Sequence, residues 1–308
     1  MKNITRINDM KTKIKDMKKF KKSKVATAIV FFLLIGIGFS SCNKEEDGID
    51  ENLITTELSD AYETTDIDDV SENINDIVES AYFELASNSF SKSTDSKTQE
   101  NNRFMSDCVT ITKVITAQNI EVTLDYGDGC TTKKEDVLSG KIQMFIVPDI
   151  LAKSVTIDYS FENFYFNSKK IEGTVNKVRI KSNENDHPQA IINRDFKIIW
   201  EDGSYAQVQG ERTREWIEGS ENLIWSDNVF SITGKMTITK RNGDIRTSTI
   251  IEPLIKNMAC KFLVSGVLQI EKNDKLRSID YGDGECDDLA MLTSNGKEYE
   301  FHIRKKNK

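Results

Sequence analysis

The spacing of apolar residues divides the chain into three parts. Residues 25–39 form a largely apolar run without charges, residues 66–86 carry apolar side chains at helical spacing, and from about residue 104 apolar and polar residues mostly alternate. The helical spacing predicts one short amphipathic helix whose other face is acidic. We expect this helix to pack on the main domain, with recognition of a partner helix as the alternative. Its apolar stripe consists of Val70, Ile74, Ile77, Val78, Ala81, Tyr82 and Leu85.

The alternation after residue 104 predicts strands separated by tight turns. Asn242-Gly243 and Asn295-Gly296 lie between β-rich runs, and Asp202-Gly203 follows another, and such pairs suit hairpin turns that need positive φ. Strands such as 174–181 are polar on one whole face and partly polar on the other, which does not suit a thick globular core. No helix is predicted after residue 102. We therefore predict a mainly β fold, a large antiparallel meander built as a curled sheet, a sandwich or an open barrel, preceded by the acidic helix.

Composition gives the expected domain boundaries. Residues 1–41 read as a signal peptide and 42–57 as an acidic tether that is poor in large apolar groups. Residues 58–103 hold the helix and a linker rich in Ser, Asn and Thr, and residues 104–308 form the all-β domain.

The N-terminus has the layout of an export signal. Residues 1–24 hold ten basic and two acidic residues, and the apolar run ends in Ser40-Ser41-Cys42. That run is shorter than the roughly 20 residues that a relaxed transmembrane helix needs. The ending resembles the lipobox of bacterial lipoproteins, which implies that Cys42 is the mature N-terminus, carries a diacylglycerol and attaches the protein to a membrane. A signal anchor with an incidental cysteine is the alternative, and Met17 is a second possible start.

The segment after Cys42 suggests where the protein is displayed. Asn43-Lys44-Glu45-Glu46-Asp47 is similar to the tag of one Lys and two acids that sends lipoproteins of Bacteroidetes to the outer face of the outer membrane. The resemblance implies an outer-membrane protein that faces the cell exterior.

Charge and histidine content narrow the function classes. Residues 42–308 hold 32 basic and 48 acidic residues, and such an acidic body would repel the phosphates of a nucleic acid. The chain has two histidines and lacks Gly-x-Ser-x-Gly and His-Glu-x-x-His motifs. His187 lies in a polar run and His302 in the last predicted strand. We therefore expect no catalytic residues, no cofactor and no metal site.

Four cysteines remain beside Cys42, and they accompany a short repeat. Cys108 and Cys260 each begin a hairpin-like stretch that ends in Asp-Tyr-Gly-Asp-Gly before Cys130 and Cys286. A Gly-Lys pair, expected to open a strand, follows each second cysteine by ten residues. We interpret 108–147 and 260–303 as an internal duplication.

The duplication selects one of the three possible cysteine pairings. A turn at Asn273-Asp274 would place residue 260 opposite residue 287, so Cys260 and Cys286 would lie within disulfide range on neighbouring antiparallel strands. The Cys108–Cys130 bond follows by analogy, and export permits both bonds.

The Asp-Tyr-Gly-Asp-Gly segments have two interpretations. Their carboxylates, Asp125 with Asp128 and Asp280 with Asp283, could offer oxygen ligands to Ca²⁺. The spacing differs from an EF-hand loop, and two carboxylates fall short of six to eight ligands. We favour a turn in which Gly supplies the conformation and Asp caps backbone N–H groups.

Several segments together resemble a group of surface lipoproteins of Bacteroidetes. They are the Cys42 region, the acidic helix, the twin cysteine units and the segments 161–166, 214–219 and 230–234. The resemblance implies location and architecture, and no catalytic residue. We expect a cell-surface lipoprotein with a non-enzymatic structural or binding role toward a protein or glycan ligand. The alternative is a glycan-binding module of a polysaccharide-uptake system, with an exposed aromatic patch drawn from Trp200, Trp216, Trp225, Tyr165 and Tyr205.

Overall fold

The computed structural model describes residues 51–90, 108–222 and 224–304, and these contain one long helix followed by a single 14-stranded sheet. The signal peptide, Cys42 and the proposed export tag lie outside the described residues. The helix is α2 (Glu51–Phe90), and a short 3₁₀ helix, η3 (Trp225–Asp227), precedes β9. The strands are β1 (Thr110–Ile115), β2 (Ile120–Asp125), β3 (Cys130–Thr131), β4 (Val137–Asp149), β5 (Ser154–Phe166), β6 (Lys169–Ile180), β7 (Gln189–Ile199), β8 (Tyr205–Glu218), β9 (Val229–Lys240), β10 (Ile245–Asn257), β11 (Ser265–Lys272), β12 (Lys275–Asp283), β13 (Leu289–Ser294) and β14 (Lys297–His302).

The sheet is an antiparallel meander in which almost every strand pairs with the next one along the chain. The order runs from β1 to β14, with β3 pairing to β4 beside the main path, and it does not return to β1. The prediction of a mainly β meander is confirmed, and of the three architectures considered the fold is the open curled sheet.

The hairpin turns lie where the sequence placed them. Lys272 pairs with Lys275 across Asn273 and Asp274, and both turn residues have positive φ. The turn glycines Gly203, Gly243 and Gly296 also have positive φ. The register of the meander therefore follows from local turn chemistry.

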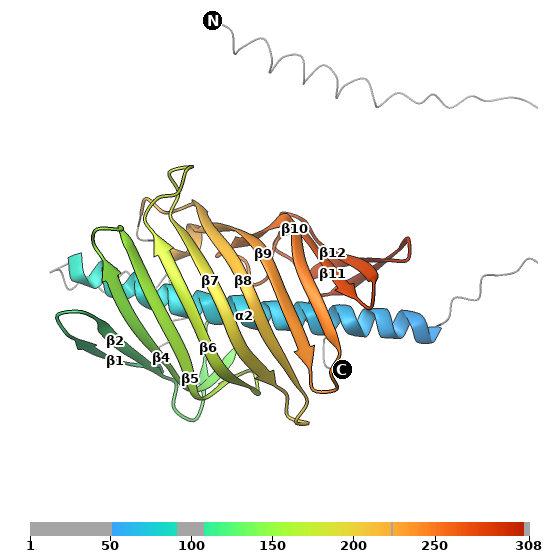
Figure 1. Ribbon diagram of the computed structural model, residues 1–308, viewed down its shortest axis with the longest axis horizontal. Coiled ribbons are helices and arrows are strands. Elements are labelled where there is room, and N and C mark those ends of the chain that lie inside the picture. Colours follow the sequence, from blue (N-terminus) through green and yellow to red (C-terminus); the bar gives the residue numbers. More distant parts are fainter. Residues whose placement is uncertain (1–50, 91–107, 223, 305–308) are drawn as a thin grey trace, which may run out of the picture. The chain divides into compact units, whose positions relative to one another are not determined.

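Helix α2 is enclosed by the curled sheet, whose strands cross it obliquely (Figure 1). Every residue from Ile67 to Ala81 is buried, although many of them are charged. The apolar stripe of the helix packs into a core with inward-facing residues of the sheet, including Leu124, Ile142 and Phe164. No stretch of a described helix is both long and apolar enough to cross a membrane.

The helix is longer than the sequence predicted. It begins at Glu51, inside the segment expected to be an acidic tether, and runs to Phe90. No Gly or Pro occurs between Gly48 and Gly127 to end it earlier. The additional first turns are held because Glu57 and Asp60 contact basic residues of the sheet, contacts that the apolar pattern alone does not reveal.

Glycines on the inner face of the sheet, the face toward α2, lie opposite two of the buried arginines and let neighbouring strands approach closely. Arg194 pairs with Gly210, and Arg212 pairs with Gly234. Gly234 has a φ of +122°, and a Cβ there would lie 2.4 Å from the carbonyl oxygen of Glu211. Only glycine fits such a close approach of two strands.

Candidate binding pocket and the charged interface around the helix

The acidic face of α2 meets a row of basic side chains from the inner face of the sheet. At its centre, Glu72 accepts hydrogen bonds from Arg194 at 2.8 Å and from Arg212 at 3.0 Å. Asp68 contacts Arg212 at 2.8 Å, and Asp76 contacts Arg214 at 2.6 Å. None of these side chains is more than 2% exposed, so the ion pairs are fully desolvated.

The same pattern continues toward both ends of the helix. Near its start, Asp60 lies 2.7 Å from Arg246 and 3.4 Å from Arg277, which also pairs with Glu57. Farther along, Glu79 pairs with Lys177 and lies 2.7 Å from Arg179. The carboxylates thus contact strands from β6 to β12.

The pKa values show which charges this interface stabilises. Burial by itself would raise the pKa of Glu72, but the charges of Arg194, Arg212 and Arg214 outweigh it and lower the pKa to about 2. Glu79 is lowered to about 2 in the same way by Arg179 and Lys177. Burial lowers the pKa of Lys177 to about 8 against the opposing charge of Glu79. Both glutamates therefore stay ionised in the interior because of their basic partners.

The sequence predicted the apolar stripe of the helix but not the burial of its acidic face. A signal was present, since Asp68, Glu72, Asp76 and Glu79 form a second stripe at helical spacing. The complementary signal is Arg212 and Arg214 at alternating positions of a strand that continues to buried Trp216. Neither pattern alone says that the two faces meet, because a polar stripe usually faces water.

A cavity of about 1270 Å³ opens where the helix meets three hairpin turns and the segment after β14. Its residues come from α2, from the turns after β5, β7 and β9, and from the segment after β14. The lining residues are Tyr62, Glu63, Asp66, Asn167, Ser168, Lys169, Trp200, Glu201, Asp202, Ser204, Tyr205, Lys240, Arg241, Asn242, Ile303 and Arg304.

The lysines that line the cavity are paired with acidic residues of the helix. Lys169 lies 2.9 Å from Asp66, and Lys240 pairs with Glu63. These ion pairs also tie the turn after β5 and the end of β9 to α2.

The two arginines of the lining are also engaged. Arg304 contacts Asp69 at 2.6 Å and Asp136 at 2.9 Å. Arg241 donates a hydrogen bond to the carbonyl oxygen of Gly203 at 3.1 Å. Each cation of the lining therefore already has an internal partner.

Two polar side chains of the lining differ from these cations. Ser168 and Glu201 have no side-chain hydrogen bond or ion pair to any residue that the structure describes, whereas the side-chain amide of Asn242 is hydrogen-bonded to Asp244. Ser168 and Glu201 come from different hairpin turns and give the lining hydrogen-bonding capacity that a ligand could use.

The expected exposed tryptophan patch is not formed. Trp216 and Trp225 are only 6% and 1% exposed, and both pack on Phe83 of the helix, with ring centroids 6.0 and 5.7 Å apart. Trp216 of β8 and Trp225 of η3 are core residues, because both pack against the helix that the sheet surrounds. Trp200 is half-buried and lines the cavity together with Tyr205.

Tyr165 is exposed, but it does not lie beside Trp200 and Tyr205 in the cavity lining. It is 37% exposed and is not part of the cavity lining. It alternates along β5 with buried Phe164 and Phe166 and so lies on the outer face of the sheet.

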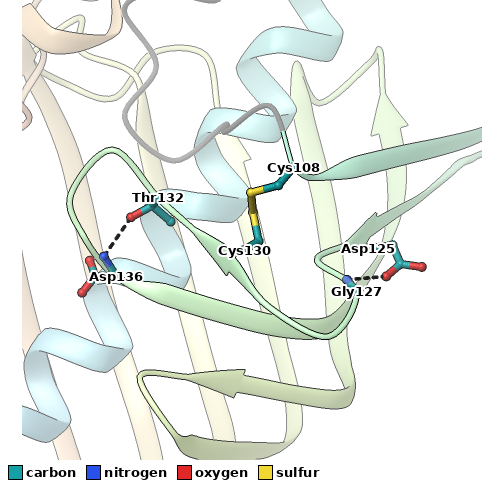
Figure 2. Close-up of a disulfide and its surroundings, with 6 residues drawn as sticks. All are labelled: Cys108, Asp125, Gly127, Cys130, Thr132 and Asp136. Atoms are coloured by element: carbon teal, nitrogen blue, oxygen red, sulfur yellow. Dashed lines mark hydrogen bonds between the residues drawn. A yellow bond between two sulfur atoms is a disulfide. The ribbon is translucent and has the colours of Figure 1, made fainter.

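Both expected disulfides are present. The Cα atoms of Cys108 and Cys130 are 5.6 Å apart, and those of Cys260 and Cys286 are 5.2 Å apart. Figure 2 shows the first bond, which joins the residues before β1 to β3. Each bond closes one local hairpin, as the sequence predicted.

The two Asp-Tyr-Gly-Asp-Gly segments share one hydrogen bond but differ in conformation, since the first forms a turn after β2 and the second continues β12 as far as Asp283. The amide of Gly127 donates to Asp125, and the amide of Gly282 donates to Asp280, both at 2.9 Å (Figure 2 for the first). The first Asp of each segment therefore caps the backbone. Among the described residues no cluster of three or more His, Cys, Asp or Glu is arranged to hold a metal ion.

The two Gly-Lys pairs, both expected to open a strand, differ in position. Lys297 opens β14, but Gly140 and Lys141 lie inside β4, where Gly140 has positive φ at a bulge. The amide of Tyr126 bonds to the carbonyl oxygen of Gly140, so the strand continues across this position.

Neither histidine is part of the cavity lining. His187 contacts Glu215 at 2.8 Å in the turn before β7, and His302 contacts Asp288 at 2.9 Å at the end of β14.

Comparison of the chain with protein-family models, curated proteins and solved structures finds no match.

Proposed function

We propose that this protein is a lipid-anchored cell-surface protein with a non-enzymatic binding role, and that the cavity beside α2 is its ligand site. The cavity carries the proposal, because the helix, the turns and the segment after β14 together line a volume with polar groups, Ser168 and Glu201, that no described residue engages. Concave sites of this kind, with a few convergent polar groups, are where small ligands bind.

The helix interface gives the cavity a fixed shape. Asp66 and Glu63 hold two of the lining lysines, while Glu72 and its arginines hold the helix within the sheet. A site that is already ordered before binding loses less conformational entropy when the ligand arrives. A purely structural role is the second candidate, and the burial of Trp216 and Trp225 favours it.

A thermal-shift screen of small polar compounds separates the two roles. The full-length lipoprotein in detergent is compared with Glu201→Trp, which adds bulk to the cavity lining and removes no internal side-chain contact. A binding role predicts compounds that stabilise the wild type and not the variant. A screen without any such compound contradicts the binding role.

The location is proposed from the sequence, with Cys42 lipidated and the segment 43–47 directing display at the outer membrane. Mass spectrometry of the mature N-terminal peptide should show a diacylglyceryl cysteine at Cys42. An unmodified N-terminus that starts elsewhere contradicts the anchor.

A further inference from the structure

We infer that the cavity beside α2 binds a neutral oligosaccharide. The inference rests on the proposed function, since it names the ligand class of that same site. Its argument has three parts: the charge balance of the lining, the aromatic side chains, and the polar groups that lack internal partners.

The charge balance excludes strongly charged ligands. The lining holds four carboxylates (Glu63, Asp66, Glu201, Asp202) and four cations (Lys169, Lys240, Arg241, Arg304). A site for phosphate or an acidic sugar needs cationic groups that can bind the ligand, but here the cations are held by carboxylates or by a carbonyl oxygen. A charged ligand that drew one of these cations away would leave the carboxylate or carbonyl oxygen that now holds it without a partner. A neutral ligand is therefore favoured.

The aromatic side chains suit the flat apolar faces of sugar rings. Trp200 is half-buried and packs against the core cluster, and it lies at the start of a tight turn in which its carbonyl accepts from the amide of Gly203 at 2.9 Å. Tyr62 packs edge-on against Phe301 with ring centroids 5.3 Å apart. Large, fixed aromatic surfaces give contact area at little cost in conformational entropy.

The polar groups suit sugar hydroxyls, which both donate and accept hydrogen bonds. Glu201 can accept hydrogen bonds, and Ser168 can both donate and accept. The two groups lie on different turns, so a ligand that meets both must have hydroxyls on more than one side. The cavity of about 1270 Å³ exceeds the roughly 300–1,000 Å³ typical of small-molecule sites, which favours an oligosaccharide over a single sugar.

The test is an array of neutral and acidic glycans probed with the full-length lipoprotein in detergent, followed by calorimetry of the tightest ligand. We expect neutral oligosaccharides to bind. Affinity should change less than about twofold between 50 and 500 mM salt, because no ion pair forms with the ligand.

The variants are chosen to separate the site from general effects on folding. Glu201→Trp should reduce affinity at least tenfold, and Tyr205→Ala should weaken binding, while Tyr165→Ala is the matched control outside the cavity. Thermal unfolding of each variant checks that it is folded. Glu201→Gln, which keeps the size of the side chain, should weaken binding less than Glu201→Trp.

The outcomes distinguish the inference from the proposed function. The inference is overturned if no neutral glycan binds, if binding falls steeply with salt, or if Glu201→Trp binds as the wild type does. If the compound screen still finds a non-saccharide ligand that Glu201→Trp excludes, the cavity remains a binding site and only the ligand class is wrong. If both experiments are negative, the proposed function fails as well.

Discussion

Neutralising Glu72 tests whether the buried ion pairs hold the helix inside the sheet. Glu72→Gln keeps the volume of the side chain, so no cavity forms, but it removes the charge that faces Arg194, Arg212 and Arg214. Breaking a buried ion pair by removing one partner typically costs about 3–5 kcal/mol, because the remaining charge stays desolvated. Asp68 and Asp76 still contact two of the arginines, which places the expected loss at the lower end, about 3 kcal/mol.

The measurement is equilibrium unfolding in urea, followed by the fluorescence of the buried Trp216 and Trp225 and by circular dichroism. A loss of about 3 kcal/mol is a large part of the roughly 5–15 kcal/mol net stability of a folded domain. Glu172→Gln is the matched control, since Glu172 pairs with Lys170 at 2.6 Å but is 47% exposed. An exposed pair contributes about 0–1 kcal/mol.

The reasoning would be refuted if Glu72→Gln and Glu172→Gln lost the same small amount. In that case apolar packing of residues such as Ile67, Ile74 and Ile77 would hold the helix by itself. A changed slope with urea in the Glu72 variant would instead report a different unfolded or native state.

Further predictions concern acid stability, the disulfides, the strand contacts and surface display. Glu72 and Glu79 have pKa values of about 2 in the folded chain against an ordinary 4.5, so unfolding titrations should show stability falling as pH drops from about 4.5 toward 2; unchanged stability there contradicts the shifts. Replacing Cys260 and Cys286 by Ser should cost about 3.5 kcal/mol in the loop-entropy model for a separation of 26 residues, read from urea midpoints. Gly234→Ala should lower the melting temperature clearly, because its Cβ would meet the carbonyl of Glu211 at 2.4 Å; a shift below 1 °C argues against the close approach. Replacing Lys44, Glu45 and Glu46 by Ala should protect the protein from protease added to whole cells, and unchanged digestion contradicts the tag.

The fold could be predicted largely from local patterns. Turn dipeptides and alternating strands act over a few residues, so the meander and the turn at Asn273-Asp274 could be read from the sequence. The disulfides could be inferred because each joins the two ends of one hairpin. The choice of an open curled sheet could not be made, because closure depends on bending summed over many strands.

The candidate site could be predicted only in part. The sequence offers Trp200 and Tyr205 as candidate ligand-binding aromatics, and both line the cavity. Trp216 is an equal candidate by sequence but is a core residue, because sequence alternation does not show whether an inner face meets water or a helix. The lining combines α2 with three turns and the segment after β14, and no local pattern brings such distant segments together.

The ion pairs also explain how a helix can be placed accurately inside so large a sheet. An apolar stripe with several similar side chains could shift along the sheet by one helical turn and still be buried. The carboxylates cannot shift in this way, since Asp60 is matched to Arg246, Glu72 to Arg212, and Glu79 to Lys177. Buried charges are known to select one register at a cost in stability. We expect the same selection here, and it would fix Tyr62 and Asp66 beside the hairpin turns, so that the cavity keeps its shape.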